Sequence, residues 1–251
     1  MDTKEEMSRR RIQRERFARA RRADRDYGIQ LRRIANNIGT LTHVYDPNKP
    51  ESAATLVNML REYAKLIAPW ARNAAIRLLG DVAQRDAEAW AEHSREMGRS
   101  LRAEIARAPT GVLLQELLVE QVGLITSLPL KSADRVQKLA LRGIVEGSRG
   151  EDIVQMILNT GEVARSRATT IARTETARVA SLLTQARAQY IGSEGYIWRT
   201  GQDSDVRPLH KELEGKLIKW SDPPVAGSNG ERAHAGQIYE CRCWAEVVLP
   251  E

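Results

Sequence analysis

The feature that most constrains the fold is a change in the spacing of apolar residues near Gly192. Before that glycine, apolar residues recur every three or four positions over long stretches, which is the period of an amphipathic α-helix. After it, short stretches of β-branched and aromatic residues alternate with loops rich in Gly, Pro, Asp and Asn. The sequence therefore predicts a mostly α protein with a small C-terminal α+β domain, in which long helices are followed by a short β-sheet.

The expected elements divide the chain into three parts. Helices are predicted over residues 4–41 and from Ser52 to about 107, the second with a kink or break at Pro69. The apolar stretch 112–130 and residues 132–146 are predicted as two further helices, with Ser132 as the cap of the second. A short helix that stops at Gly161 and a long one from there to Gly192 complete the helical part. The predicted strands are GYIWRT, KLIKW and CRCWAEVV. The expected organisation is a basic N-terminal helical arm (1–44), a helical body (45–192) and a small α+β domain (193–251).

Length and composition argue against several classes of protein. The chain has 251 residues, enough for one large or two small domains. It has no run of about 20 apolar residues, so no contact with a membrane is expected, and its N-terminus lacks the apolar core of a secretory signal. Both cysteines lie close to the C-terminal end, so a disulfide framework is not expected to hold the fold together.

The excess positive charge is confined to the N-terminal arm. Residues 1–33 hold 12 Lys and Arg against 6 Asp and Glu, which accounts for the whole formal net charge of +6. Such an arm predicts contact with double-stranded DNA or with an acidic protein surface, and a solvated charged helix is the alternative. Few aromatic residues are present to stack on single-stranded bases. The candidate contact residues are Arg9, Arg10, Arg11, Arg14, Arg16, Arg19, Arg21, Arg22 and Arg25.

A narrow apolar seam overlaps the end of the arm. Its residues are spaced alternately four and three apart: Tyr27, Leu31, Ile34, Ile38 and Leu41. This spacing is typical of a helix that packs along one line on another helix. We predict that the seam and the arm together dock on the subunits of a larger assembly.

The densest polar stretch is TGQDSDVRPLH, residues 200–210. Asp203, Asp205 and His210 would suit metal-assisted hydrolysis if their side chains converged. In the alternative, the two aspartates bind backbone amides in a turn and Arg207 pairs with a carboxylate. No H-E-x-x-H, G-x-S-x-G or P-loop pattern supports catalysis, so we do not expect an enzyme. We predict that Asp203, Arg207 and His210 form a buried or half-buried network near the cysteines.

The two cysteines, Cys241 and Cys243, are separated by one residue. On a strand they would share a face with Cα atoms about 7 Å apart, slightly beyond the usual span of a disulfide. They could share a Zn²⁺ ion with His210 and a fourth group such as His234, although structural zinc sites more often use Cys-x-x-Cys. The favoured alternative is two semi-buried thiols with Arg242 on the opposite face. We therefore expect no cofactor, with structural zinc as the alternative.

Four segments in a fixed order carry a resemblance to a known family. They are GSRGEDIVQMI, RATTIARTETARVAS, WRTGQDSDVRPLHKELEGK and CRCWAEVV. The series resembles the phage head morphogenesis family, minor head proteins similar to the Mu F and SPP1 gp7 proteins, over about residues 115–248. The matching residues are Ala172, Arg173, Thr174, Glu175, Trp198, Thr200, Asp203, Val206, Arg207, His210, Gly215, Cys241, Arg242 and Cys243. The chain departs from the family pattern at Glu214, where members often have Asp, and at 237–240, where many have Pro-x-x before the cysteines.

The resemblance implies a minor capsid protein of a tailed bacteriophage without catalytic activity. It would act in head morphogenesis by binding the portal protein and the major capsid protein, and would assist DNA packaging or delivery. The protein would lie in the head interior near the portal, and in the host cytoplasm during assembly. Some relatives carry a C-terminal toxin domain, for which no room is expected here. Two alternatives stay open, a metal-dependent nuclease or hydrolase using Asp203, Asp205 and His210, and a DNA-binding module that uses the basic arm.

Overall fold

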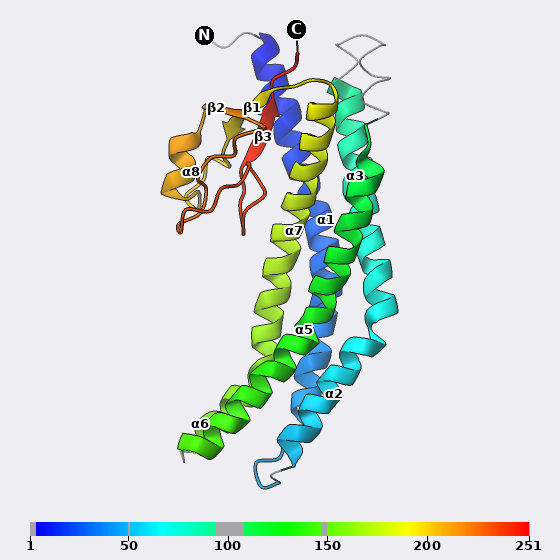
Figure 1. Ribbon diagram of the computed structural model, residues 1–251, viewed down its shortest axis with the longest axis vertical. Helices are drawn as coiled ribbons and strands as arrows, with labels where there is room; N and C mark the ends of the chain where they lie inside the picture. The colour runs from blue at the N-terminus through cyan, green and yellow to red at the C-terminus, as the bar shows by residue number, and fades with distance from the viewer. Residues whose placement is uncertain (1–3, 50, 94–107, 147–149, 251) are drawn as a thin grey trace. The chain divides into compact units, whose positions relative to one another are not determined.

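The computed structural model consists of long helices and one small sheet (Figure 1). It describes residues 4–49, 51–93, 108–146 and 150–250. In chain order these form α1 (Lys4–Thr42), α2 (Ser52–Leu66), α3 (Ala68–His93), α5 (Thr110–Glu146), α6 (Gly150–Leu158), α7 (Thr160–Tyr190), β1 (Gly195–Arg199), α8 (Pro208–Leu213), β2 (Leu217–Lys219) and β3 (Trp244–Val247). The predicted fold class, mostly helical with a small α+β region near the C-terminal end, is confirmed.

Two of the predicted helix boundaries are wrong. α5 continues through Pro129 and Ser132, where a new helix was expected. The Ser132 hydroxyl donates to the carbonyl of Leu128, 2.9 Å away and one turn earlier in the same helix, so it does not cap an N-terminus. Gly161 lies inside α7 instead of ending the preceding helix. The break at Pro69 is confirmed, because this proline lies in the first turn of α3, where a missing N–H leaves no hydrogen bond unmade.

The chain forms two compact units, each assembled from segments far apart in the sequence. The helical unit comprises residues 25–77 and 118–172, and the sheet unit comprises residues 1–24, 78–117 and 173–251. The expected division at residues 44 and 192 stays a prediction.

The helical unit buries the apolar seam of α1. Tyr27, Leu31, Ile34 and Ile38 are at most 3 % exposed, and Leu41 is half-buried. The Tyr27 hydroxyl, also inside this unit, donates to Oε1 of Gln121 over 3.0 Å. The spacing thus marked a line of core packing within the chain itself. Because these side chains are covered, they are not an exposed surface on which another subunit could dock.

Two glycines bring α1 and α7 close together in the helical unit. A Cβ atom placed on Gly161 would lie 2.6 Å from the Cα atom and 3.1 Å from the nitrogen of Gly39. Any side chain at position 161 would therefore push against backbone, which explains a glycine inside a helix despite its unfavourable helix propensity. A Cβ atom on Gly39 would lie 3.7 Å from the Cα atom of Gly161, an ordinary contact distance.

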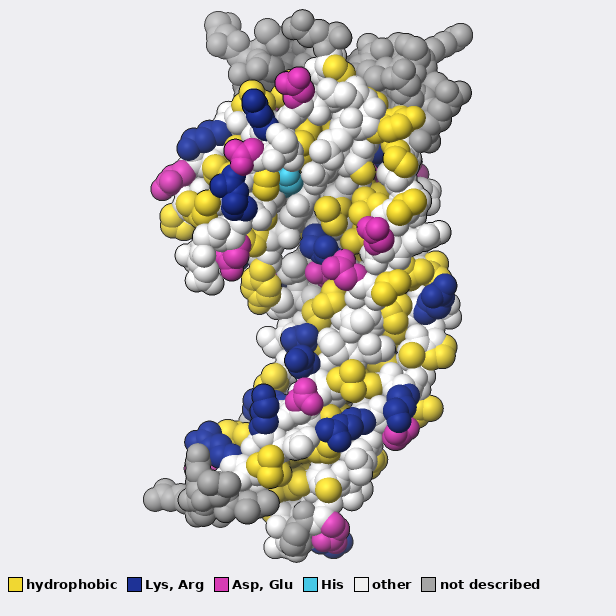
Figure 2. Space-filling model, viewed as in Figure 1, with side chains coloured by type: hydrophobic (Ala, Val, Ile, Leu, Met, Phe, Trp, Pro, Cys, Tyr) yellow, Lys and Arg dark blue, Asp and Glu magenta, His cyan; other side chains and the backbone are white. Residues whose placement is uncertain are grey.

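α5 is apolar, and part of its apolar surface is exposed. Its stretch Thr110–Gly143 is long and apolar enough to cross a membrane by length and composition, a measure that the core helix of a globular protein also meets. Within the helical unit, Val119, Leu130 and Leu141 are 75, 43 and 55 % exposed. A separation of 11 residues is about three turns, so the three share one side of the helix. Over α5 and α6, the visible face mixes hydrophobic with basic side chains (Figure 2). The expected absence of membrane contact stays a prediction.

The sheet unit contains an antiparallel sheet with the strand order β2–β1–β3. Register runs from Gly195↔Lys219 to Ile197↔Leu217 on one side of β1, and from Tyr196↔Val247 to Arg199↔Trp244 on the other. Three short strands bury little apolar surface by themselves. The core of the sheet therefore includes Trp90 of α3 and Ala188 of α7 beside Tyr196 and Trp198 of β1.

Candidate metal centre

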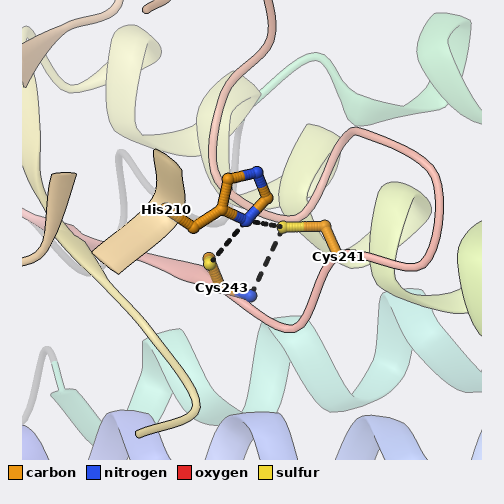
Figure 3. A group of neighbouring side chains, drawn as sticks. All are labelled: His210, Cys241 and Cys243. Carbon is orange, nitrogen blue, oxygen red and sulfur yellow. Dashed lines mark hydrogen bonds between the residues drawn. The ribbon is translucent and has the colours of Figure 1, made fainter. Parts of the chain in front are cut away.

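His210, Cys241 and Cys243 come together in the core of the sheet unit (Figure 3). Nδ1 of His210 lies 3.7 Å from the sulfur of Cys241 and 3.4 Å from the sulfur of Cys243. All three residues are at most 4 % exposed, and their ligand atoms lie within 4.8 Å of one another. Among the residues that the structure describes, this is the group whose spacing would suit a metal ion.

The short helix α8 presents the histidine. Pro208 stands at its start, where a ring-fixed φ angle favours the first turn of a helix. A hydrogen bond fixes the orientation of the His210 ring, because Nε2 lies 2.9 Å from the carbonyl oxygen of Ala226 and donates to it. The ring also meets Trp198 edge to face, with centroids 5.5 Å apart. The other ring nitrogen, Nδ1, consequently carries its lone pair toward the two sulfurs.

The cysteines do not lie on a strand, and this part of the sequence interpretation is wrong. β3 begins at Trp244, so the segment before it is irregular. Glu240 has a φ angle of 47°, and the backbone N–H of Cys243 points at the sulfur of Cys241 over 3.4 Å. The irregular backbone that follows the turn at Glu240 brings the two sulfurs within 4.8 Å of each other. Both cysteines are free thiols.

The three groups influence one another's protonation. The hydrogen bond from Cys243 is the main reason why the pKa of Cys241 lies well below its ordinary value; burial opposes this shift and His210 reinforces it. The same hydrogen bond raises the pKa of Cys243, and burial raises it further. The pKa of His210 is raised mainly by its hydrogen bond with Cys241, against the effect of burial. The pair thus favours one thiolate beside the histidine.

The predicted network of Asp203, Arg207 and His210 is divided into separate interactions. Asp203 accepts a hydrogen bond from Arg242 over 2.7 Å, and Asp205 pairs with the same guanidinium, also at 2.7 Å. Asp203 also accepts the backbone N–H of Asp205, as expected for a turn. Arg207 donates to the carbonyl of Tyr239 over 2.9 Å, not to a carboxylate. The two aspartates therefore hold Arg242, and the structure does not join them to His210 as a hydrolase site.

His234, named as a possible fourth ligand, has other partners. Its Nδ1 lies 3.2 Å from the hydroxyl of Tyr196, and its Nε2 lies 3.2 Å from the carbonyl of Trp220. The Tyr196 oxygen in turn accepts the backbone N–H of Ala235. Both nitrogens of the His234 ring are engaged, so this residue does not complete the group around His210.

The Arg-Thr-Glu segment of α7 packs against the turn that carries the cysteines. The Thr174 hydroxyl accepts the backbone N–H of Glu240 over 3.1 Å, and Arg173 lies 3.9 Å from the carboxylate of the same residue. In the same segment, Glu175 pairs with Arg178 at 3.0 Å. This helix segment therefore supports the cysteine turn.

A second polar cluster, which the sequence interpretation missed, closes the end of β1. Glu214 accepts the backbone N–H and the hydroxyl of Thr200 over 2.6 and 2.7 Å, and its other oxygen lies 3.3 Å from Arg199. Arg199 also pairs with Glu246 of β3. Glu214 stands where relatives often have Asp, and this position before Gly215 was the available signal.

The side chains of the basic arm are largely outside the described part of the structure. The backbone of α1 is helical from Lys4, as predicted. Arg25 is exposed. The remaining arm residues, Arg9 to Arg22, lie outside the residues whose side chains are described, so their contacts with DNA or protein stay a prediction.

The chain is similar in sequence to one relative over most of its length and to one family over a shorter segment. The chain is 30 % identical over 202 residues to an uncharacterized protein of Haemophilus influenzae, an alignment that covers 79 % of this chain and 44 % of the relative. The chain thus spans less than half the length of that relative. No solved structure matches this chain. Residues 134–246, which include the Arg-Thr-Glu helix, His210 and both cysteines, match the sequence model described as Phage Mu protein F like protein. This segment of the chain is therefore similar to the phage Mu F-like family, as the order of its motifs predicted.

Proposed function

We propose that the protein is a minor head protein of a tailed bacteriophage that acts in head morphogenesis by binding the portal protein and the major capsid protein. The observation that carries the proposal is the match of residues 134–246 to the Mu F-like family. In this proposal the protein is made in the host cytoplasm and lies in the head interior near the portal. It assists DNA packaging or delivery without catalysing a reaction.

The surface of α5 suits contact with another head subunit. Val119, Leu130 and Leu141 lie exposed on one side of this helix at intervals of about 16 Å, so a partner helix laid along that side would cover all three. The apolar seam of α1 is buried in the chain's own core, so α5 takes its place in the proposal. The basic arm adds a charge that would attract packaged DNA or an acidic subunit surface.

The alternative of a metal-dependent hydrolase has less support. Asp203 and Asp205 are both paired with Arg242. Hydrolysis assisted by a metal needs carboxylates or histidines that share the ion and leave room for a water. These aspartates are not members of the group formed by His210 and the cysteines. A structural role in the head is therefore the better supported proposal.

The test is incorporation into heads. Cells that produce the portal, scaffolding and capsid proteins together with this chain should yield purified heads that contain it, as measured by quantitative mass spectrometry. The double variant Val119→Glu, Leu130→Glu should lower its copy number per head. Lys131→Glu is the matched control, because residue 131 is exposed but lies about 100° around the helix from Leu130.

The outcomes separate two parts of the proposal. Wild-type protein that is absent from heads would refute the head role itself. Equal incorporation of the double variant and Lys131→Glu would refute only the α5 contact. For the arm, binding of the full chain to double-stranded DNA should fall steeply with salt, since released counterions drive such binding. No binding at low salt would leave an acidic protein surface as the arm's partner.

A further inference from the structure

We propose that His210, Cys241 and Cys243 bind a Zn²⁺ ion through one nitrogen and two sulfurs, with the fourth ligand position open to an adjoining pocket. The first support for this site is the distance between the ligand atoms. A tetrahedral zinc with Zn–S and Zn–N bonds of about 2.3 and 2.1 Å holds nitrogen and sulfur ligands about 3.6 Å apart. The two observed nitrogen–sulfur distances are 3.7 and 3.4 Å. Both nitrogen–sulfur separations are therefore close to those that the ion would impose, and the two sulfurs lie within 4.8 Å of each other.

The orientation of the histidine is also that of a metal ligand. A metal-bound histidine usually donates its other ring N–H to a carbonyl or carboxylate, which fixes the tautomer and the plane of the ring. Nε2 of His210 donates to the buried carbonyl of Ala226 over 2.9 Å. Nδ1 points at both sulfurs (Figure 3). The ring therefore offers a lone pair at the place where zinc would lie.

A buried donor beside the sulfurs points to an anionic ligand. The indole N–H of Trp198 is buried, forms no hydrogen bond of ordinary geometry, and has the sulfur of Cys243 as its nearest interaction partner. Trp198 packs against His210 and lies near Cys243. Leaving a donor of this kind unsatisfied typically costs about 1–3 kcal/mol. Two thiolates bound to Zn²⁺ would give this donor an anionic sulfur to face, while their charges and that of the ion sum to zero and so keep burial inexpensive.

The fourth position faces a small pocket at the surface of the sheet unit. The pocket is lined by the three ligands and by Asp205, Val206, Arg207, Glu240 and Arg242. Its two carboxylates or a water molecule could complete the tetrahedron. The ion would connect α8 to the irregular segment before β3, in addition to the hydrogen bond from Arg207 to the carbonyl of Tyr239. A small sheet with a limited core gains stability from such a cross-link.

The experiment uses the purified full-length protein without a histidine tag. Elemental analysis should find about one zinc per chain, and both thiols should react slowly with a disulfide reagent until a chelator is added. Replacement by Co²⁺ should produce thiolate-to-cobalt charge-transfer absorption. Wild-type protein without zinc or charge-transfer bands, with two equally reactive thiols or a Cys241–Cys243 disulfide, would overturn the proposal.

Variants test the ligand set. His210→Ala and Cys243→Ser should lose the zinc and the cobalt absorption. His234→Gln is the matched control, since this buried histidine of the same unit lies outside the group and its variant should keep one zinc. Asp205→Asn and Glu240→Gln should shift the cobalt d–d bands only if that carboxylate is the fourth ligand. If the ligand variants do not fold, the cobalt titration of the wild-type protein still decides whether the site exists.

Discussion

Glu214 should stabilise the sheet unit far more than its half-exposed position suggests. Its carboxylate accepts two short hydrogen bonds from Thr200, one from the backbone and one from the hydroxyl, and it approaches Arg199. Thr200 is buried, so Glu214→Ala leaves two donors poorly satisfied. Hydrogen bonds to a charged group contribute about 1.5–3 kcal/mol each. The pair with Arg199 contributes little, since Glu214 is partly exposed and Arg199 keeps Glu246.

Allowing for water that reaches part of the carboxylate, we expect Glu214→Ala to lower the free energy of unfolding by about 2–4 kcal/mol. For a chain of this size, this corresponds to a fall in Tm of roughly 5–15 °C. The assay is thermal and urea unfolding followed by tryptophan fluorescence. Glu212→Ala is the control, because Glu212 lies two residues earlier, on α8, and is exposed; this variant should change the free energy of unfolding by less than about 0.5 kcal/mol. Equal effects of the two variants would refute the reasoning.

Three further predictions concern other parts of the molecule. Gly161→Ala should destabilise the helical unit by about 2 kcal/mol or more, because its methyl group would press on the backbone of Gly39. Gly39→Ala should be tolerated, because its methyl group would lie at an ordinary contact distance. Urea unfolding of both variants measures the difference, and equal stability of the two would contradict the close approach of the helices. Asp86→Ala should lower the free energy of unfolding by about 3 kcal/mol, because Asp86 accepts hydrogen bonds from buried Arg187 over 2.6 Å and from Thr184. Glu88→Ala is the control on the same helix: Glu88 is exposed, so this variant should lower the free energy of unfolding much less. Burial lowers the pKa of His234 in spite of its hydrogen bond to Trp220. The unfolded chain therefore takes up a proton below about pH 6.5 before the folded one does, and stability falls as the pH falls through that range. Tm values from pH 8 to 5 should drop more for the wild type than for His234→Gln, and parallel curves would exclude this contribution.

The sequence carried most of the helical architecture because helical spacing reports which side of a helix is covered. It failed where tertiary packing overrode a local signal. Gly161 looks like a helix stop, but it is required inside α7 by the close approach of Gly39. Pro129 and Ser132 look like a boundary, but α5 continues through both. Local rules of this kind describe an isolated segment, and only the folded chain decides between them.

For the candidate site, residue types were more informative than geometry. The Cys-x-Cys segment and His210 were identified as a group, yet the cysteines were expected on a strand and the structure places them in the irregular segment that precedes β3. The structure does not support His234 as a fourth zinc ligand, because both of its ring nitrogens already have partners in Tyr196 and Trp220. Glu214 was missed because its partner Thr200 lies on the far side of a loop, and no spacing rule connects the two.

The composition of the sheet core has a consequence for synthesis on the ribosome. Trp90 packs in one cluster with Trp198 and Val247, so the native packing of α3 cannot form until residues much later in the chain have been synthesised. At about 5–20 residues per second, roughly 8–30 s separate the synthesis of Trp90 from that of Val247. During that interval a large aromatic surface has no native partner and is a target for chaperones. The speed of translation through residues 90–247 should therefore influence the yield of soluble protein, and slow codons in this stretch should lower it.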